Sequence, residues 1–187
     1  MSDAELIELA RNGDRAAFGD LVERYQQVVF RTALAALRSR EDAEEVAQDA
    51  MVSAFRKLGS FRGDASFKTW LLTITWNRAM DRRRRVGEWF RRFVSPDADH
   101  GFEFASAAPS HEETLVARES RKEVRRLLLK LPSTYRDVLV LSASGDHTFE
   151  QIGRLLGIPT GTAKWRAAEG RRLLKKRLIS RGIRAAG

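Results

Sequence analysis

The strongest structural signal in the sequence is TFEQIGRLLGIP, residues 148–159, followed directly by the basic stretch TGTAKWRAAEGRRLLKKRL, residues 160–178. Apolar residues of the first stretch recur at helical spacing and predict one buried helix face: Phe149, Ile152 and Leu156. Gly157 supplies a tight turn before the second helix. Together the two stretches are typical of a helix-turn-helix.

The second of these helices has two different sides. Small and apolar residues along one side allow the helix to lie close against a neighbour: Ala163, Ala167, Gly170, Leu174 and Leu178. The opposite side carries Gly161, Trp165, Glu169, Arg172 and Lys176, with Lys164, Arg171 and Lys175 on one flank. A DNA-recognition helix needs this division, because its first residues reach base edges while flanking cations hold phosphates. Glu169 could accept from a cytosine amino group, and Trp165 could pack on a thymine methyl group. A solvated basic helix, or one that docks on an acidic protein, is the alternative interpretation.

The whole chain is basic and contains no cysteine. Its 187 residues include 34 Lys and Arg against 25 Asp and Glu, a formal net charge of +9. This excess points to a polyanionic partner, a solvated basic surface being the alternative. The absence of cysteine excludes disulfide scaffolds, Cys-based zinc sites, iron–sulfur clusters and thiol nucleophiles. No uncharged run exceeds nine residues, so we expect no membrane insertion and a cytoplasmic location.

The charge alternates along the chain. Residues 1–50 sum to −5, residues 51–92 to +8, residues 93–120 to −5 and residues 121–187 to +11. From Phe93 to Ala117 there is no Lys or Arg, and this stretch is rich in Ser and Ala, which predicts a flexible linker. We therefore expect a domain over 1–92, an acidic linker over 93–117 and a domain over 118–187. The linker is interpreted as a solvated tether, as a segment kept off nucleic acid, or as one that fills a basic channel in a partner.

Helical signals fill the rest of the sequence and β-hairpin turn signals are missing, so the predicted fold class is all-α, with two small helical domains. Ser2 and Glu5 predict a capping box at the start of a short helix that ends at Asn12-Gly13, and Asp14 predicts the cap of a long second helix. The inward positions expected on that second helix are Phe18, Leu21, Val22, Tyr25, Val28, Val29, Thr32 and Ala36. A third helix is expected over about 41–58, with Gly59 as its C-terminal glycine, and a fourth from about 66 into 82–85. In the second domain, a helix is expected over about 113–130. Leu131-Pro132 then breaks the helical pattern, and another helix follows to about residue 142.

Aromatic and arginine residues gather in FRGDASFKTWLLTITWNRAMDRRRR, residues 61–85. Single-stranded nucleic acid requires such a combination, because unstacked bases need aromatic surfaces and their phosphates need cations. One helix face also collects apolar side chains, namely Phe67, Trp70, Leu71 and Ile74. Core packing is the favoured interpretation for Trp70 and Ile74.

Several separated motifs resemble bacterial sigma factors of the extracytoplasmic-function (ECF) subclass, sigma-70 family, over residues 14–85 and 118–178. The motifs are DAEEVAQDA (42–50), FRKL (55–58), FRG (61–63), TWL (69–71), Leu131-Pro132, Tyr135-Arg136 and GTAK (161–164). Members of that family have two helical DNA-binding domains joined by a flexible linker, and they direct core RNA polymerase to promoters. The resemblance implies a promoter-specificity subunit that is not an enzyme, with no catalytic residue, no metal and no cofactor.

The resemblance also implies two promoter contacts. The loop from Ser60 to Phe67 would capture a base flipped from the −10 element, and the helix after it would engage the duplex edge. The residues expected there are Arg62, Asp64, Ser66, Phe67, Lys68, Asn77, Arg78, Arg82, Arg83, Arg84 and Arg85. The residues expected at the −35 element are Thr160, Gly161, Thr162, Lys164, Trp165, Arg166, Glu169, Arg171 and Arg172. Family members commonly carry Ser at the position of Trp165 and Arg at that of Glu169, so this chain departs from the pattern at both.

Protein partners follow from the same resemblance. The helix from Asp42 to Leu58 would dock on the β′ clamp helices of core RNA polymerase through Asp42, Glu45, Gln48, Asp49, Met51 and Phe55. The β flap is a second expected contact of the polymerase, and an anti-sigma factor would cover both domains. Because the chain has no cysteine, a redox or envelope signal would have to be sensed by a partner. Residues 89–93, WFRRF, are expected to form a short extension that packs on the first domain.

Two other function classes fit parts of the sequence. A conventional dimeric helix-turn-helix regulator would bind half-sites about one helical turn apart, but it leaves the acidic linker and the aromatic segment without a role. A nucleic-acid enzyme would use the carboxylates of residues 42–49 with a divalent metal. Those carboxylates share one helix with no converging partner and no nearby His, so an acidic helix face is the simpler interpretation.

Overall fold

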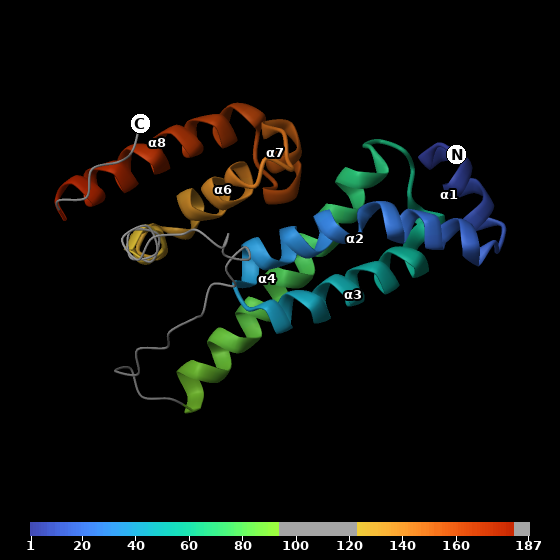
Figure 1. Ribbon diagram of the computed structural model, residues 1–187, viewed down its shortest axis with the longest axis horizontal. Helices are drawn as coiled ribbons and strands as arrows, with labels where there is room; N and C mark the ends of the chain where they lie inside the picture. The colour runs from blue at the N-terminus through green and yellow to red at the C-terminus, as the bar shows by residue number, and fades with distance from the viewer. Residues whose placement is uncertain (94–122, 182–187) are drawn as a thin grey trace, which may run out of the picture. The chain divides into compact units, whose positions relative to one another are not determined.

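The computed structural model describes residues 1–93 and 123–181, and within these ranges all regular secondary structure is helical. The chain divides into two compact units, Met1–Ala105 and Ser106–Gly187, whose helices are labelled in Figure 1. The all-α prediction is confirmed. The predicted linker, residues 93–117, lies outside the described residues except for Phe93, so its bounds stay predictions. Among the helices of the described ranges, none is both long enough and apolar enough to span a bilayer.

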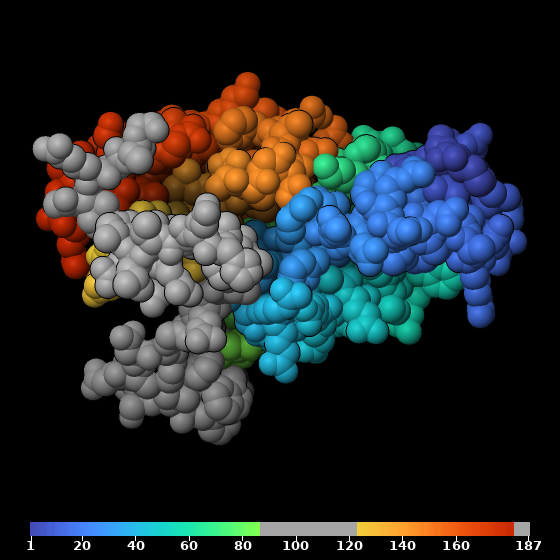
Figure 2. Space-filling model, viewed as in Figure 1, coloured from blue at the N-terminus to red at the C-terminus, as the bar shows by residue number. Residues whose placement is uncertain are grey.

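Three long helices pack against one another in the first unit: α2 (Arg15–Leu37), α3 (Arg40–Lys57) and α4 (Phe67–Phe93). The short helix α1 (Asp3–Arg11) packs on α2, and a 3-10 turn, η1 (Leu58–Ser60), follows α3. In the space-filling view of Figure 2, the surfaces of α2 and α3 lie side by side.

Local capping explains where the first helices begin. The Ser2 side chain accepts from the Glu5 N–H at 3.3 Å, and the Glu5 carboxylate accepts from the Ser2 N–H at 2.7 Å, which confirms the predicted capping box. The carboxylate of Asp14 accepts from the amides of Ala16 and Ala17 at 2.9 and 3.2 Å and so caps α2, as predicted. Each cap satisfies amides that the first turn of a helix leaves without a partner.

The end of α3 differs in detail from the prediction. The α-helix stops at Lys57, and the chain tightens into the 3-10 turn η1, which contains Gly59. The residues with left-handed backbone in the described ranges include Gly63, at φ +81°, but not Gly59. The prediction that Gly59 ends the helix with a left-handed backbone is therefore wrong. A 3-10 turn ends the helix instead, and the glycine with positive φ, Gly63, lies four residues later.

The core of the first unit is built largely from α2 and α4. The predicted inward positions of α2 are buried, except for Val22 and Tyr25, which are half-buried. On α4, Phe67 and Leu71 are buried, whereas Trp70 and Ile74 are half-buried, so the core-packing interpretation of the latter two holds only in part. The other buried positions of α4 are Thr69, Leu72, Thr75, Trp76 and Ala79. The buried face of α4 is wider than its apolar period suggested, because both α2 and α3 pack on it.

Helix α4 is longer than the sequence predicted. It continues beyond Arg85 to Phe93, so residues 89–93 belong to its last turns. The predicted packing of these residues on the first domain concerns side chains outside the described set.

The second unit contains a helical segment, residues 123–129, followed by α6 (Ser133–Ala143), α7 (Phe149–Leu156) and α8 (Thr160–Ile179). The break at Leu131-Pro132 is present, and the predicted start of the preceding helix near residue 113 lies outside the described residues. Both α6 and α7 pack on α8. This arrangement confirms the predicted helix-turn-helix.

Two glycines allow the helices of the second unit to approach closely. A Cβ added at Gly153 of α7 would lie 2.7 Å from the carbonyl oxygen of Ile158, and one added at Gly170 of α8 would lie 2.9 Å from a methyl carbon of Leu139 on α6. Gly157, at φ +65°, makes the left-handed turn after α7 that the sequence predicted. The predicted small-residue side of α8 is buried, apart from the half-buried Leu174.

The apolar face of α7 is turned slightly from the predicted one. Ile152 is buried as expected, but Phe149 and Leu156 are half-buried, and Gly153 and Leu155 are buried instead. The shift follows from the close approach at Gly153, which brings this side of α7 against the turn.

Candidate nucleic-acid interface

Aromatic rings hold together the base of the loop between η1 and α4. The ring of Phe61 meets that of Phe67 edge-on at 5.7 Å between centroids, and Trp70 lies 5.3 Å from Phe61. Tyr25 of α2 adds a fourth ring, 5.7 Å from Phe67. Because Phe67 is only 3% exposed, its ring supports the loop from within. The half-buried Phe61 and Trp70 supply the accessible aromatic edges.

The tip of the loop places predicted polar residues on the surface. Arg62 and Asp64 are exposed on either side of the left-handed Gly63. Ser66 begins α4, because its hydroxyl oxygen accepts from the Thr69 N–H at 3.2 Å and contacts the Thr69 hydroxyl at 2.9 Å. Lys68, which follows on the first turn of α4, is half-buried. The loop therefore has a fixed base and an exposed, polar tip.

The exposed part of α4 carries a second group of predicted residues. The exposed members are Asn77, Arg78, Arg84 and Arg85, and Arg83 is half-buried. Arg84 pairs with Asp81 one turn earlier, and a guanidinium nitrogen of Arg78 donates to the Ser53 hydroxyl at 3.1 Å. A phosphate can exchange for the exposed Arg84 pair, whereas Arg78 reaches the buried Ser53 of α3, which is 5% exposed.

Arg82 differs from its neighbours because it faces α3. Its Nε and Nη2 donate to one Asp42 carboxylate oxygen at 3.0 and 2.6 Å, and its Nη1 donates to Glu45 at 2.9 Å. The bonds to Asp42, more than those to Glu45, raise the pKa of Arg82 against the opposing effect of partial burial. The structure thus joins a residue predicted for DNA with two predicted for polymerase.

The outer face of α3 is polar at one end and apolar at the other. Gln48 and Asp49 are exposed, Met51 is half-buried, and Phe55 is 43% exposed with its ring 4.9 Å from that of Phe18. Val52, 44% exposed, was not among the predicted residues. Its spacing, four after Gln48 and three before Phe55, was the signal that puts it on this face. In the described parts of the chain, no three acidic or His side chains come together as a metal site would require.

The outer face of α8 presents an unusual aromatic residue. Trp165 is 59% exposed, and its ring lies 6.1 Å from that of Tyr135 on α6. Of the other predicted residues around it, Gly161, Lys164 and Arg171 are exposed, and Thr160, Thr162 and Arg166 are half-buried. Trp165 is thus an exposed ring on α8 whose sequence neighbours, Lys164 and Arg166, are both cations.

Glu169 and Arg172 of α8 are already paired with each other. The guanidinium group donates from Nε and Nη2 to the two carboxylate oxygens, at 2.8 and 2.6 Å. These hydrogen bonds lower the pKa of Glu169 and raise that of Arg172. A contact of Glu169 with a cytosine amino group would therefore use the lone pairs that Arg172 leaves open.

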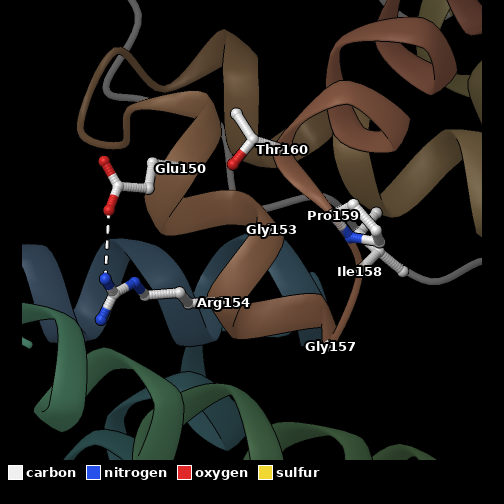
Figure 3. A pocket seen from close by; sticks show the side chains of 7 residues that line it. All are labelled: Glu150, Gly153, Arg154, Gly157, Ile158, Pro159 and Thr160. Carbon is white, nitrogen blue, oxygen red and sulfur yellow. Dashed lines mark hydrogen bonds and ion pairs between the residues drawn. The ribbon is translucent and has the colours of Figure 1, made fainter. Parts of the chain in front are cut away.

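A shallow hollow of about 450 Å³ lies at the turn between α7 and α8. Figure 3 shows the residues that line it. Arg154 of α7 pairs with Glu150 of the same helix at 3.1 Å. Ile158 comes from the turn and Thr160 from the start of α8. Arg154 is exposed and was not predicted as a site residue. The available signal was a cation in the last turn of the first helix, next to the stretch that begins the second.

Two family models match the chain. Sigma-70 region 2 matches residues 21–88, and Sigma-70, region 4 matches residues 121–174. The first match covers α3, the aromatic loop and most of α4, and the second covers the helix-turn-helix.

Curated relatives match along nearly the whole chain. The chain is 31% identical over 176 residues to the ECF RNA polymerase sigma factor SigW of Bacillus subtilis, covering 92% of this chain and 94% of that protein. It is 34% identical over 177 residues to the ECF RNA polymerase sigma factor SigM of Mycobacterium tuberculosis, covering 95% and 85%. It is 32% identical over 189 residues to the ECF RNA polymerase sigma-E factor of Escherichia coli, covering 95% of both.

Two solved structures are similar in fold. One is CnrH in complex with the cytosolic domain of CnrY, with a TM-score of 0.66, 25% identity and coverage of 95% of this chain and 97% of that one. The other is the sigma factor RpoE in complex with the anti-sigma factor NepR from Bartonella quintana, with a TM-score of 0.65, 22% identity and coverage of 87% and 96%. The second likeness concerns the fold alone.

Proposed function

The chain belongs to the ECF group of sigma-70 factors and is a promoter-specificity subunit of RNA polymerase, and from this premise we propose which surfaces of its two units meet DNA and polymerase. Neither the fold nor the comparisons favour the dimeric regulator considered from the sequence. We assign the subunit no reaction of its own: the free energy that opens the promoter comes from binding.

The loop over residues 61–66 is the proposed site for a base of the −10 element. A flipped base loses a few kcal/mol of stacking and pairing energy, which contacts in the loop must offset. The accessible edges of Phe61 and Trp70 offer stacking surface, worth about 1–3 kcal/mol per base. The exposed Arg62 and Asp64 offer polar contacts to a base edge and its backbone. Phe67, being buried, supports this surface rather than touching the base.

The outer face of α4 is the proposed contact with the duplex edge. Asn77, Arg78, Arg84 and Arg85 are exposed there and can reach phosphates. We assign Arg82 to the junction of α3 and α4, because three of its nitrogens already donate to Asp42 and Glu45.

Helix α8 is the proposed reader of the −35 element. Lys164, Arg166 and Arg171 flank the face that Trp165 occupies, which suits phosphate contacts around a central base contact. Trp165 is assigned an apolar contact with a thymine methyl group. Glu169 and Arg172 act as a pair, so that changing either one alters the charge presented to the bases.

The outer face of α3 is the proposed polymerase contact. Gln48 and Asp49 supply polar contacts, and Val52 and Phe55 supply the apolar surface that a stable interface needs at its centre. The β′ clamp helices are the proposed partner of this face, and the β flap that of the second unit.

An anti-sigma factor is the remaining proposed partner. CnrH was solved with the cytosolic domain of CnrY, and RpoE with the anti-sigma factor NepR. We propose that an inhibitor of this kind covers the same α3 and α8 surfaces here. Titrating the subunit with a candidate inhibitor should abolish core binding, and core binding that persists at saturation would exclude that candidate.

The coexistence of a loop with an aromatic base and an exposed polar tip and of a basic helix-turn-helix in one chain is the observation that carries the proposal. The test adds the purified subunit to core RNA polymerase on a library of genomic promoters and sequences the transcript starts. Starts should share a −10 and a −35 motif at fixed spacing. Specific starts that depend on only one motif would remove the assignment of the other unit.

A further inference from the structure

Helix α1 lies outside the residues matched by the family model, 21–88, yet it contacts the first end of the proposed base-capturing loop directly and the second end through Tyr25 of α2. We propose that α1 sets the shape of this loop, with Arg11 as a positioning residue for base capture. The inference rests on the proposed function of the loop, and it adds a helix and a residue to that site.

Arg11 binds the chain where the loop begins. Its Nε donates to the carbonyl oxygen of Leu58 at 3.3 Å, and its Nη2 donates to the carbonyl oxygen of Phe61. Its Nη1 donates to Glu8, one turn earlier in α1, at 2.7 Å. The guanidinium group is thus oriented by its own helix and spans the two carbonyls that bracket η1.

This contact suits arginine and no other side chain. The Phe61 N–H already donates to the Leu58 carbonyl at 3.2 Å and closes the 3-10 turn. Arg11 adds a second donor to Leu58 and one to Phe61, which requires a planar group with several N–H bonds in fixed directions. Lysine would keep the charge but lacks this fork.

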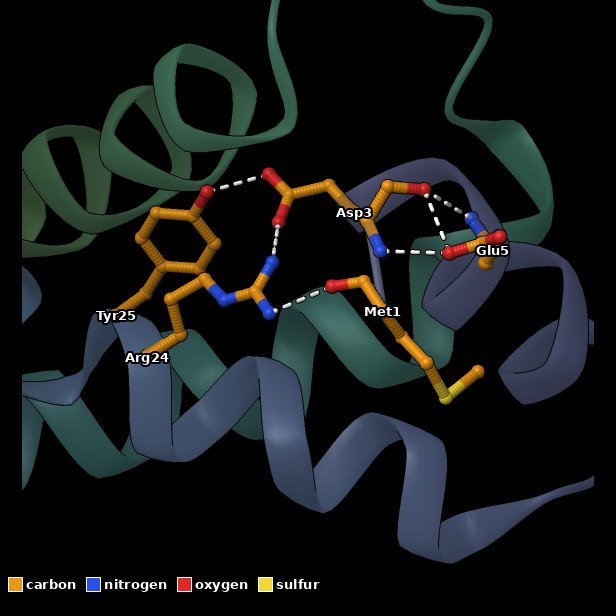
Figure 4. A network of polar contacts seen from close by, with 6 residues as sticks. Met1, Asp3, Glu5, Arg24 and Tyr25 are labelled. Carbon is orange, nitrogen blue, oxygen red and sulfur yellow. Dashed lines mark hydrogen bonds and ion pairs between the residues drawn. The ribbon is translucent and has the colours of Figure 1, made fainter.

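A second contact secures the other end of the loop. Figure 4 shows the Tyr25 hydroxyl and the Arg24 guanidinium group both directed at the Asp3 carboxylate of α1. Arg24 also donates to the Met1 carbonyl at 3.0 Å. The ring of Tyr25 lies against Phe67, the first residue after the loop.

The two contacts act on the same short segment. Arg11 holds the chain up to Phe61, and Asp3 holds Tyr25 against Phe67. The rings of Phe61 and Phe67 meet each other, so the distance between the loop's ends is defined. Only the tip between these ends remains exposed, in the conformation that Gly63 permits.

Stability and positioning are carried by different residues of α1. Leu6, Ile7 and Ala10 are 1%, 5% and 6% exposed and anchor the helix in the core. The side chain of Arg11 is 28% exposed and ends on loop carbonyls. Removing its fork should therefore leave the fold intact and free the loop.

The test uses holoenzymes assembled from core RNA polymerase and full-length subunits: wild type, Arg11→Lys, and a control, Arg15→Lys, which makes the same change at an exposed position of α2. The probes are single-stranded oligonucleotides that span the −10 element of a promoter that the subunit uses. The set contains, for each position, four oligonucleotides that differ only in the base at that position. The readout is the ratio of affinities for the preferred base and the other three. Core affinity and the thermal midpoint are measured in parallel.

Arg11→Lys should reduce the base preference about five- to tenfold, with core affinity unchanged and the thermal midpoint lowered only slightly, and Arg15→Lys should behave like wild type. A merely structural role would lower the midpoint and leave the preference of the assembled holoenzyme intact, and that result overturns the inference. Tyr25→Phe, which keeps the ring but removes the bond to Asp3, should give a smaller loss of preference of about threefold. Should Arg11→Lys fail to assemble, an unchanged preference in Tyr25→Phe is the contradicting result. If the wild-type holoenzyme itself shows no base preference, base capture by the loop is refuted. That result is distinct from a failure of the role proposed for Arg11.

Discussion

Arg82 connects two surfaces of the first unit through a single side chain. The guanidinium group and the two carboxylates of α3 are about one-third to one-half exposed, at 29% for Arg82, 30% for Asp42 and 53% for Glu45. Water weakens such pairs, but three charge-assisted hydrogen bonds from one shared cation make this group stronger than an isolated surface pair. Its position on α4 suggested a DNA contact, whereas its contacts assign it to the junction with α3.

Arg82→Gln should lower the free energy of unfolding by about 1 kcal/mol and leave the salt dependence of promoter binding unchanged. Arg85→Gln, the matched control on the exposed side of α4, should keep stability and reduce the slope of log K against log salt by about 0.9. Denaturant unfolding of the free subunit and holoenzyme binding at several salt concentrations measure the two effects. A reduced slope for Arg82→Gln would show that Arg82 leaves Asp42 when DNA binds.

Tyr25 offers a titration that reports on α1. Burial, followed by the hydrogen bond to Asp3 and its negative charge, raises the pKa of Tyr25 to about 12. A pKa that is higher in the folded state stabilises the fold below the ordinary value near 10, and this contribution is lost as the pH rises from 10 through 12. Because the chain has two tyrosines, a Tyr135→Phe background leaves Tyr25 as the single phenol.

In that background, absorbance at about 295 nm should show no phenolate until well above pH 10. Adding Asp3→Asn should bring the titration to lower pH, since the charge and the strong acceptor are removed. A midpoint that Asp3→Asn does not move would mean that the contact between α1 and Tyr25 is not formed in solution.

The helix-turn-helix depends on one close approach between elements. The hydrogen atom at the α-carbon of Gly153 leaves room for the Ile158 carbonyl, and both groups belong to backbone that cannot turn aside. Gly153→Ala should therefore destabilise the second unit by about 1–3 kcal/mol. Gly161→Ala, where a Cβ meets nothing within 4 Å, should leave stability unchanged or raise it by up to about 1 kcal/mol. Thermal unfolding of the two variants measures the difference, and equal midpoints would contradict the close approach.

The points at which helices begin and end were not all equally predictable. Ser2, Asp14 and Gly157 act on neighbours in sequence, so their roles could be predicted from local spacing. The hydrogen bond from Arg11 to the Leu58 carbonyl, at the end of α3, joins residues that lie 47 apart in sequence. No local pattern contains that information.

The candidate site shows the same division. The exposure of Arg85, Lys164 and Trp165 agrees with the helical period alone. The burial of Phe67 and the pairing of Arg82 depend on which helices cover α4, and these were decided by packing between α2, α3 and α4. Val52 was missed although its spacing from Gln48 and Phe55 places it on the same helix face, because an apolar residue next to Met51 and Ala54 does not show from sequence whether it is exposed or buried.

At the scale of the whole molecule, the alternating charge of the sequence corresponds to different surfaces. The basic block 51–92 contains the loop and α4, the basic block 121–187 contains the helix-turn-helix, and the acidic block 1–50 contains most of α3. The two proposed DNA-binding surfaces have one sign of charge and the proposed polymerase-binding surface has the other, an arrangement that suits a subunit with both kinds of partner.

Val52→Asp tests the proposed contact between α3 and core RNA polymerase. It should weaken binding to core RNA polymerase at least about tenfold, because a charge would enter the apolar centre of the α3 interface. Leu9→Asp places the same charge at another exposed apolar residue, 39% exposed on α1, and should leave core affinity unchanged. Neither should shift the thermal midpoint appreciably. Equal core affinity of the two variants would move the polymerase contact away from the outer face of α3.

Each unit encloses its own core, so the two units can evolve independently of each other. A substitution that loosens packing around Gly153 leaves the aromatic rings around Phe67 intact, since the two lie in separate units. After gene duplication, changes at the proposed −35 contacts Trp165 and Glu169 in one copy can therefore alter its upstream motif while the proposed −10 loop stays as it was. Selection can then diversify the set of genes under control one half of the chain at a time.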